Sequence, residues 1–363
     1  MHYVFGSARR SIAPGSMGVL SIILAVIGIS VLVIVHEGGH YLAARAFGMR
    51  VLRYSIGFGP TLFKYKPKNS PTTFQIGAIP FLAYVQIAGM NPHEEVDPDD
   101  PEIYPNKGVF ARIVTIVAGP VANYLAASVM VFALALSGFP DNQVKEPMAV
   151  GTVLEDTPAA EAGLRPGDVI VEANGQPIRT IEDLKEVTSP RGGEPTEYVV
   201  KRDGHRLPPI TLTPEARDGE GFIGVSAQTE RIYTQMTAGE AVEAAFLFPF
   251  QLTVRQLEGL ASLAKERTTE GLTGPVGMGK IVAEQAGRGV PEYVLILVVL
   301  SVALGMFNLL PFPALDGGRL AFLGYELVTR RRPNERIEAA VHTVGLLFLL
   351  GVLVLVTFRD VMG

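Results

Sequence analysis

The sequence predicts a multi-pass α-helical membrane protein with about four transmembrane helices, a membrane-associated β-hairpin or sheet, and an inserted α+β domain. Of its 363 residues, 48% are hydrophobic and only 18% are charged, a balance too apolar for an ordinary soluble protein. Several apolar runs come close to the ~20 residues that a helix needs to cross a bilayer. Between two of these runs, residues 149–228 carry charges, glycines and prolines, which indicates a domain outside the lipid.

The composition also limits the chemistry that the chain can perform. It contains no cysteine, so disulfides and thiolate metal ligands are excluded, and any metal site must use His, Asp or Glu. The net charge is −5 and no long basic tract is present. We therefore expect no nucleic-acid partner.

Residues 1–16 are expected to be a leader or tail, and residues 17–148 to form the first part of the membrane core. The first span runs from residue 17 to about residue 47. Arg9 and Arg10 precede it as in a signal peptide, but the run is long and no cleavage motif follows it. We therefore expect a retained helix.

The motif His36-Glu37-Gly38-Gly39-His40 closes the apolar part of this run. On a helix, His36 and His40 leave the same face about one turn apart, so both imidazoles can bind one metal ion. Glu37 can then address a water on that metal, as in zinc hydrolases with a His-Glu-x-x-His motif. The alternative is a packed pair of histidines beside an acid, which has little reason to occur in an apolar segment of membrane length.

Residues 51–90 predict a small sheet directly after this motif. Strand-like segments at 53–59, 72–79 and 83–87 accompany a turn-rich stretch at 66–71. An exposed edge of this sheet can pair with an unwound substrate, and Gly77 and Ile79 are the candidate residues for that contact. A structural cap over the membrane end is the alternative.

A second span is expected at residues 113–136. Its Gly119-Pro120 pair bends the helix, and Asn123 places an amide at membrane depth. We expect Asn123 either to bond to a neighbouring helix or to face the reaction site, where it is a candidate substrate contact.

Two regions separate the second span from the third. In residues 149–228, strands are expected at 149–154, 168–173, 198–201 and 210–213, with a turn at Asn174-Gly175 and a short helix at 181–187 capped by Thr180. Residues 229–290 are expected to hold an amphipathic membrane-surface helix, kinked at Pro249, and a linker. Packing of that helix against the inserted domain is the alternative.

Residues 291–363 predict the second part of the membrane core. The third span, 293–310, runs into a bend with two prolines and two glycines that contains Asp316. A catalytic zinc uses three protein ligands and the helix motif supplies two, so Asp316 is the best remaining candidate. An ordinary Asp-Gly turn is the alternative. The fourth span is expected at 339–358, with His342 as a packed residue.

Lysine and arginine are concentrated between the first two spans and again after the third span. The positive-inside rule therefore predicts that both segments are cytoplasmic. The metal motif and Asp316 then meet near the cytoplasmic side. The inserted domain and both termini are expected on the opposite side.

Five motifs occur in the chain in a fixed order: His36-Glu37-x-x-His40, Ala-Gly-Pro-x-x-Asn at 118–123, Gly-Leu-Arg-Pro-Gly-Asp at 163–168, Gly-Pro-Val-Gly at 274–277 and Asn-Leu-Leu-Pro-x-Pro-x-Leu-Asp-Gly-Gly at 308–318. Together they resemble the site-2 protease family, and more narrowly its bacterial regulator-of-sigma-E type with a single PDZ domain. Gly38 departs from the phenylalanine of the family pattern. The resemblance implies that His36, His40 and Asp316 bind Zn²⁺ and that Glu37 activates water.

The resemblance also implies that residues 149–228 are a PDZ domain that filters or docks substrates, and that Asn308 contacts the substrate. The implied substrates are single-pass membrane proteins, such as anti-sigma factors already trimmed by an upstream site-1-type protease, or remnant signal peptides. The implied location is the bacterial inner (plasma) membrane, with lipid as a direct partner.

The expected function is therefore zinc-dependent hydrolysis of peptide bonds within transmembrane segments, in regulated intramembrane proteolysis. One alternative is a non-catalytic membrane scaffold that binds protein tails through the inserted domain, which the intact set of His36, His40 and Asp316 disfavours. The other is a metal transporter, which should carry further ionisable residues along its spans. We find only His342.

Overall fold

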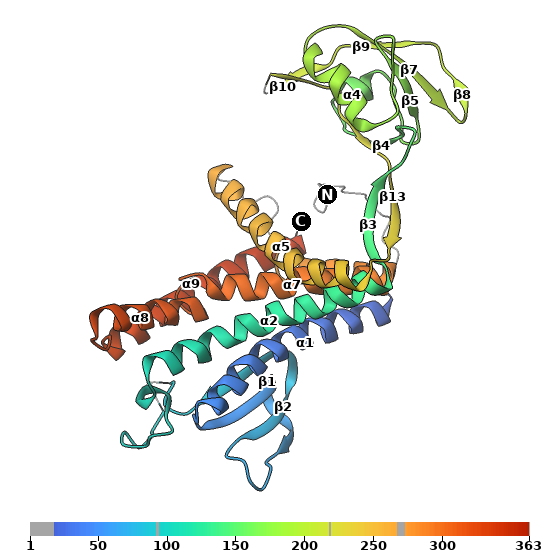
Figure 1. The fold of residues 1–363 in the computed structure, drawn as a ribbon. Coiled ribbons are helices and arrows are strands. Elements are labelled where there is room, and N and C mark those ends of the chain that lie inside the picture. Colours follow the sequence, from blue (N-terminus) through green and yellow to red (C-terminus); the bar gives the residue numbers. More distant parts are fainter. Residues whose placement is uncertain (1–17, 92–93, 218, 267–272, 363) are drawn as a thin grey trace. The chain divides into compact units, whose positions relative to one another are not determined.

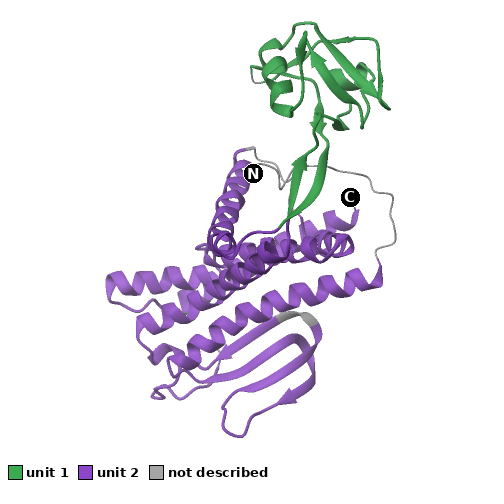
Figure 2. Ribbon diagram, turned by 45° about the vertical axis from the view of Figure 1, so that its right-hand side comes forward, with its two compact units in different colours: residues 1–13, 140–234 green, residues 14–139, 235–363 purple. Residues whose placement is uncertain are grey.

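The computed structural model describes residues 18–91, 94–217, 219–266 and 273–362, and the predicted leader at 1–16 lies outside them. The described residues form two compact units (Figure 2): the smaller comprises residues 140–234, and the larger comprises residues 18–139 and 235–362. The smaller unit is longer than the expected 149–228 because a pair of strands leads into and out of it.

Four helices of the larger unit are long and apolar enough to cross a membrane, which confirms the predicted fold class. Figure 1 shows α2 lying alongside α1, and α7 also packs against α2. The four helices are α1 (Val19–Ala46), α2 (Val109–Ser137), α7 (Val290–Leu309) and α9 (Glu335–Met362). The buried face of α1 repeats every three or four residues, as a helix requires; its buried residues are Ala25, Gly28, Leu32, His36, His40 and Ala44.

Two glycines let α1 approach its neighbours closely. A Cβ atom at Gly39 would lie 2.1 Å from the carbonyl oxygen of Ala118, and one at Gly28 would lie 2.5 Å from the hydroxyl of Tyr293. That hydroxyl donates a hydrogen bond to the carbonyl of Leu24 at 2.7 Å. Close packing and hydrogen bonds of this kind hold membrane helices together, because lipid is as apolar as their side chains.

The residues after α1 form two long strands, β1 (Val51–Tyr65) and β2 (Thr73–Ile87). In their register, Tyr54 of β1 is paired with both Val85 and Phe74 of β2. The predicted strand at 83–87 is therefore the last part of β2, because the chain stays extended through the residues between the two predicted strands.

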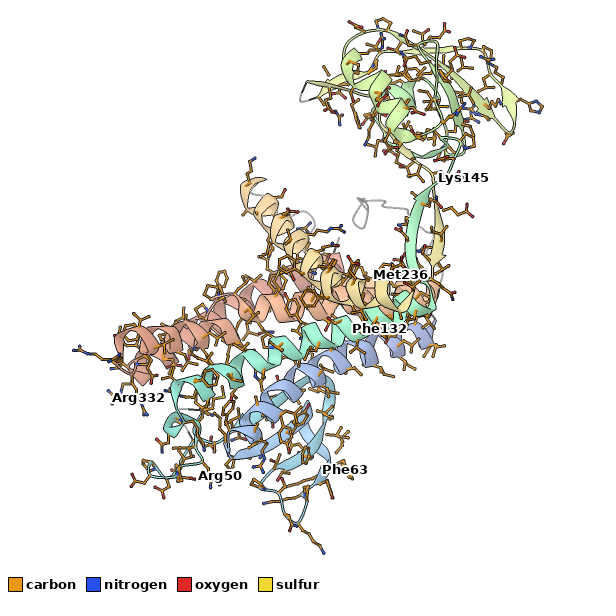
Figure 3. All side chains as sticks on the ribbon, in the orientation of Figure 1. Arg50, Phe63, Phe132, Lys145, Met236 and Arg332 are labelled. Carbon is orange, nitrogen blue, oxygen red and sulfur yellow. The ribbon has the colours of Figure 1, made fainter. Side chains whose placement is uncertain are left out.

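The sheet is fixed to α1 at one end and exposes apolar side chains elsewhere. The hydroxyl of Tyr54 donates a hydrogen bond to the carbonyl of Ile34 in α1 at 2.7 Å. Phe63, labelled in Figure 3, has an exposed fraction of 59%, and Leu62 beside it has 71%. Exposed apolar side chains grouped on one element are typical of surfaces that contact lipid or another chain.

The smaller unit is an α+β unit of short strands. Its main sheet has the strand order β6-β5-β7-β8, and β9 also pairs with β7; further pairs are β4 with β12, β10 with β11, and β3 with β13. The strands are β3 (Phe139–Val144), β4 (Val150–Val153), β5 (Val169–Ala173), β6 (Gln176–Pro177), β7 (Thr196–Arg202), β8 (His205–Arg206), β9 (Ile210–Leu212), β10 (Glu215–Arg217), β11 (Glu220–Phe222), β12 (Val225–Ala227) and β13 (Thr229–Thr234). Its helices are α3 (Pro158–Glu161) and α4 (Ile181–Thr188).

Local sequence signals set the elements of this unit. Asn174 and Gly175 have φ values of 49° and 77°, which confirms the predicted tight turn between β5 and β6. The backbone N–H of Asp183 donates to Oγ1 of Thr180 at 3.1 Å, and the N–H of Thr180 donates back to Asp183 at 2.9 Å. This capping box confirms the predicted start of α4. Tyr198 of β7 is fully buried in the core.

The described residues of the larger unit also form three further α-helices, α5 (Ala238–Glu266), α6 (Pro275–Arg288) and α8 (Asp316–Thr329), and a short 3-10 helix at Tyr104–Asn106. The α5 helix contains Pro249, and Figure 1 shows that it changes direction along its length. The α6 helix begins with Pro275, and Asp360 of α9 accepts hydrogen bonds from the N–H groups of Gly274 and Gly277 at its start. Helices α6 and α8 were not predicted from the sequence, because the glycines and prolines at their starts indicated only a break.

A buried ion pair joins α8 to α2. Two guanidinium nitrogens of Arg112 donate to the two carboxylate oxygens of Glu326, at 3.0 and 2.5 Å. Both side chains have exposed fractions below one tenth. Removing one partner of such a pair leaves a buried charge without compensation, so the pair holds α8 against α2.

In the smaller unit, Asp168 ties the loop at 163–167 to β7. Arg202 donates two hydrogen bonds to its carboxylate, at 2.7 and 2.8 Å, and the N–H of Arg165 donates a third at 2.8 Å. Burial alone would raise the pKa of the Asp168 carboxyl, but the hydrogen bonds from Arg202 and Arg165 outweigh burial and hold this pKa below its ordinary value.

A carboxyl with a lowered pKa stabilises the folded state above its unfolded-state pKa, near 4, and loses that contribution as the pH falls further. We expect Asp168→Asn to destabilise the smaller unit at pH 7. The difference in free energy of unfolding between wild type and Asp168→Asn should become smaller at pH 3. Hydrogen exchange of peptides from β5 and β7 in the full chain measures this difference, with the exposed Glu155→Gln as control. An equal difference at both pH values would contradict the assignment.

Candidate active site

The two histidines of the helix motif face each other on the buried side of α1. Their rings meet edge to face with centroids 4.9 Å apart, and the Nε2 atoms of His36 and His40 are 3.2 Å apart. Both residues have exposed fractions below one tenth. The spacing of four residues predicted this arrangement, because it places both rings on one helix face.

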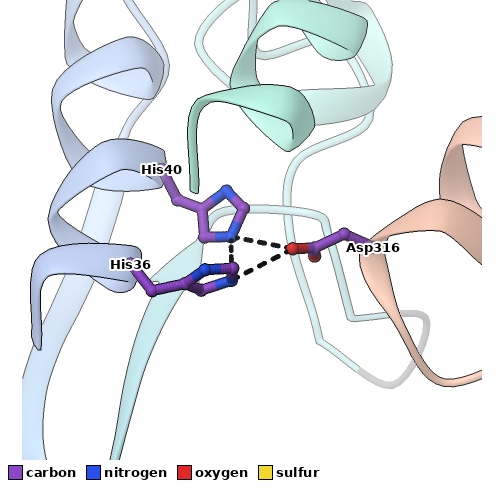
Figure 4. Close-up of side chains that lie close together, drawn as sticks. All are labelled: His36, His40 and Asp316. Carbon is purple, nitrogen blue, oxygen red and sulfur yellow. Dashed lines mark hydrogen bonds and ion pairs between the residues drawn. The ribbon is translucent and has the colours of Figure 1, made fainter. Parts of the chain in front are cut away.

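Asp316, the first residue of α8, reaches the same point from the far end of the chain (Figure 4). Its Oδ2 atom lies 3.1 Å from Nε2 of His36 and 3.3 Å from Nε2 of His40. The structure therefore brings together the three residues that the sequence analysis selected as metal ligands.

The three donor atoms fit a zinc ion. Zinc–nitrogen and zinc–oxygen bonds are about 2.0–2.2 Å long, so two ligand atoms of a tetrahedral site should be roughly 3.3–3.6 Å apart. The observed separations are 3.1, 3.2 and 3.3 Å, at or just below this range, so a small outward shift of the donors accommodates the ion. Two imidazoles and one carboxylate suit zinc, and three protein ligands leave one position for water or substrate.

Helix α2 holds both histidine rings from behind. Nδ1–H of His40 donates a hydrogen bond to the carbonyl of Thr115 at 2.8 Å, which leaves Nε2 free to bind metal. Nδ1 of His36 lies 3.3 Å from the amide of Asn123. In the structure it is Nδ2 that faces the ring, and Oδ1 of Asn123 has no partner among the described residues. Turning the amide by 180° would let Oδ1 accept a hydrogen bond from Nδ1–H of His36 when Nε2 binds metal.

Glu37 lies half-buried beside the three donor residues, His36, His40 and Asp316. Its Oε2 atom accepts a hydrogen bond from the backbone N–H of Val85, in the last part of β2, at 2.9 Å. This contact fixes the carboxylate between α1 and the sheet, so that the side chain cannot swing freely. Sequence reasoning placed Glu37 beside the histidines but could not identify its strand partner.

The four residues predicted to contact substrate lie in different surroundings. Asn123 is fully buried and contacts His36, so a role behind a metal ligand fits it better than the predicted contact with substrate. Asn308 donates from Nδ2 to the carbonyl of Leu304 in its own helix, at 2.9 Å. A Cβ at Gly77 would lie 2.7 Å from the carbonyl oxygen of Phe58, so this glycine permits close strand pairing. Ile79 is 46% exposed and remains available for contact.

Gly119 of α2 is a site residue that sequence reasoning did not select. A Cβ atom at Gly119 would lie 2.3 Å from Nε2 of His40, the atom that faces the metal position. The signal was present in the Gly119-Pro120 pair, which was interpreted only as a bend. Gly38, in contrast, has room for a side chain. A Cβ atom at Gly38 would lie 3.7 Å from the hydroxyl oxygen of Tyr54, an ordinary contact distance.

The close approach of Gly119 to His40 predicts that Gly119→Ala displaces the imidazole and lowers metal affinity by roughly tenfold or more. Alanine favours helix over glycine, so a loss would not come from weaker helix formation. Gly324→Ala in α8 is the matched control, since a Cβ there meets no atom within 4 Å. Chelator competition with the purified chain measures the affinities, and equal affinity for the two variants would contradict the prediction.

The contact between Asn123 and His36 predicts a second change in metal affinity. Asn123→Leu removes the acceptor for Nδ1–H at similar volume, and we expect roughly 10–100-fold weaker metal binding. Asn123→Asp keeps an acceptor and should retain most of the affinity. The prediction would be wrong if both variants bound the metal equally well in the same competition assay.

Several known proteins are similar to this chain in sequence. The sequence model of peptidase family M50 matches residues 24–352. The chain is 34% identical to a provisionally named zinc metalloprotease of Mesorhizobium japonicum, covering 92% of this chain and 96% of that protein. It is 31% identical to the metalloprotease MmpA of Caulobacter vibrioides, covering 92% and 93%. A solved PDZ domain of an SdrC-like protein from Listeria monocytogenes is 23% identical, with a TM-score of 0.20, covering 23% of this chain and 90% of that one.

The predicted resemblance to site-2 proteases is thereby confirmed, and so is the predicted use of zinc. With two histidines and an aspartate gathered among membrane-length helices, the chain belongs to peptidase family M50 and is a membrane-bound zinc metalloprotease.

Proposed function

We propose that this protease cleaves peptide bonds within the transmembrane segments of single-span membrane proteins. The observation that carries the proposal is the position of the donor cluster. His36 and His40 lie within α1, a helix long and apolar enough to span a membrane, and Asp316 follows α7, another such helix. A site built at this depth suits a peptide bond that lies in the membrane.

The chemistry divides between the metal and Glu37. His36, His40 and Asp316 would hold a zinc ion, which would supply a polarised scissile carbonyl and a water with a pKa lowered towards 7. The Glu37 carboxylate is placed to accept a proton from the attacking water and to return it to the leaving amine. The hydrogen bond from the N–H of Val85 keeps Glu37 oriented for both transfers.

A helical substrate hides its carbonyls and must unwind before cleavage. The last part of β2 lies next to Glu37, since Val85 contacts it directly. An extended substrate added to this sheet as a further strand would hold its peptide bond near the general base. The exposed apolar side chains of the sheet, Phe58, Leu62 and Ile79 among them, support contact with such a segment.

The proposed location is the bacterial inner membrane, with the metal site near the cytoplasmic side. Arg50 and Arg332 lie toward one end of the larger unit (Figure 3), as the positive-inside rule expects of cytoplasmic segments. The smaller unit, the proposed PDZ domain, would then lie on the other side and filter or dock substrates. Proposed substrates are anti-sigma factors trimmed by an upstream site-1-type protease, or remnant signal peptides.

The test compares cells that carry the wild-type chain with cells that carry Glu37→Gln. Glutamine keeps an oxygen that accepts from the N–H of Val85, but it cannot take a proton from water. We expect a roughly 10²–10⁴-fold loss of cleavage, the usual contribution of a general base. Membrane proteomics should show single-span fragments accumulating with Glu37→Gln.

The matched control is Glu243→Gln, on an exposed position of α5, which should leave the profile unchanged. Metal content and folding of Glu37→Gln are checked in the purified protein. The proposal would be overturned if Glu37→Gln is folded and metal-loaded but its cells show the same single-span fragments as wild-type cells. That result would favour a non-catalytic scaffold.

A further inference from the structure

The direction of Asp316 is set by the short loop that precedes it. This loop, residues 310–315, joins α7 to α8 and contains two prolines. Ala314 within it has a φ of 73°, a left-handed conformation that residues with a Cβ seldom adopt unless their surroundings hold them. The loop's own turn, closed by a hydrogen bond from the N–H of Leu315 to the carbonyl of Phe312 at 3.2 Å, spans Ala314 two residues before the predicted metal ligand. A contact from outside the loop supports this turn.

His342 of α9 supplies that contact. The backbone N–H of Ala314 donates a hydrogen bond to Nδ1 of His342 at 3.0 Å. The imidazole also lies against Phe322 of α8, with ring centroids 5.8 Å apart. One side chain thus contacts both the loop and the helix that carries Asp316.

The next two turns of α9 continue the same contact. A Cβ at Gly345 would lie 2.3 Å from the Cβ of Pro313, so only glycine lets α9 come this close. The ring of Phe348 lies 5.8 Å from that of Phe312. Spaced three residues apart, His342, Gly345 and Phe348 form one stripe on α9. We call these three residues the α9 stripe.

The other side of the loop packs on the start of α8. A Cβ at Gly317 would lie 2.0 Å from the carbonyl oxygen of Leu310, and one at Gly318 would lie 2.5 Å from that of Phe312. The loop therefore has these glycines on one side and the α9 stripe on the other. A shift of α9 at His342 or Gly345 acts directly on the loop.

We propose that His342, with Gly345 and Phe348, is a positioning residue that holds Asp316 in line with His36 and His40 through the loop at 310–315. The inference rests on the proposed role of Asp316 as a metal ligand. It assigns a part in the metal site to the fourth span, which contributes no donor atom to the described cluster.

The test measures metal affinity by chelator competition in the purified full chain, together with the visible spectrum of the cobalt-substituted protein. His342→Leu removes the acceptor and should weaken zinc binding about tenfold or more, with a changed cobalt spectrum. His342→Asn places Oδ1 close to the position of Nδ1, and should keep affinity within about threefold. Equal loss in both variants would overturn the proposal.

Two alanine substitutions in the same helix give a matched pair. Gly345→Ala pushes against Pro313 and should weaken zinc binding as His342→Leu does. Gly351→Ala meets no atom within 4 Å and should leave it unchanged. If His342→Leu does not fold, Gly345→Ala and its control Gly351→Ala test the proposal instead. Zinc affinity equal to wild type in Gly345→Ala would overturn it.

A double-mutant cycle separates positioning from general damage. In an Asp316→Ala background, His342→Leu should cause no further loss of zinc affinity, because the ligand that it positions is gone. Equal losses with and without Asp316 would refute action through that residue. Because the readout is metal binding, it stays distinct from the Glu37→Gln experiment, which tests proteolysis alone.

Discussion

The structure depends on one constraint: polar groups placed among apolar helices must find partners within the protein. His36, His40 and Asp316 meet this constraint by converging on one point, where a metal ion can satisfy all three. Helix α2 satisfies the outer nitrogens of the rings, through the carbonyl of Thr115 and the amide of Asn123. The site therefore requires α1, α2 and α8 to be assembled together.

Close helix packing serves the site as well as the fold. Gly39 of α1 allows the backbone of α2 to approach at Ala118. The next residue of α2, Gly119, leaves room for the imidazole of His40. Asp316 is held in a comparable way from several sides. The ion pair between Arg112 and Glu326 fixes the body of α8, while the loop before Asp316 packs against α9. Metal ligands need such support, because small displacements of a ligand are costly.

Local properties of the chain were enough to predict the spans and the helix motif. Hydrophobic length identifies a span without knowledge of its neighbours, and a spacing of four residues places His36 and His40 on one face. The capping residue Thr180 and the turn at Asn174-Gly175 likewise act through bonds within a few residues. Asp316 followed from the number of ligands that zinc requires and from its position after the third span.

Contacts between elements could not be predicted in this way. An apolar run does not specify which helix its faces meet, so the partners of His36, Glu37 and His40 came only from the tertiary structure. Helix α8 begins with Asp316 and two glycines, and in the sequence this start resembled a simple turn. His342 was expected to be a packed residue, and only the fold placed its ring against the backbone of Ala314. The sequence by itself determined the spans, the helix motif and the chemistry of the donor atoms, because these are local. The tertiary structure decided how the donors are oriented, because orientation depends on residues far apart in the chain that meet only when the helices pack.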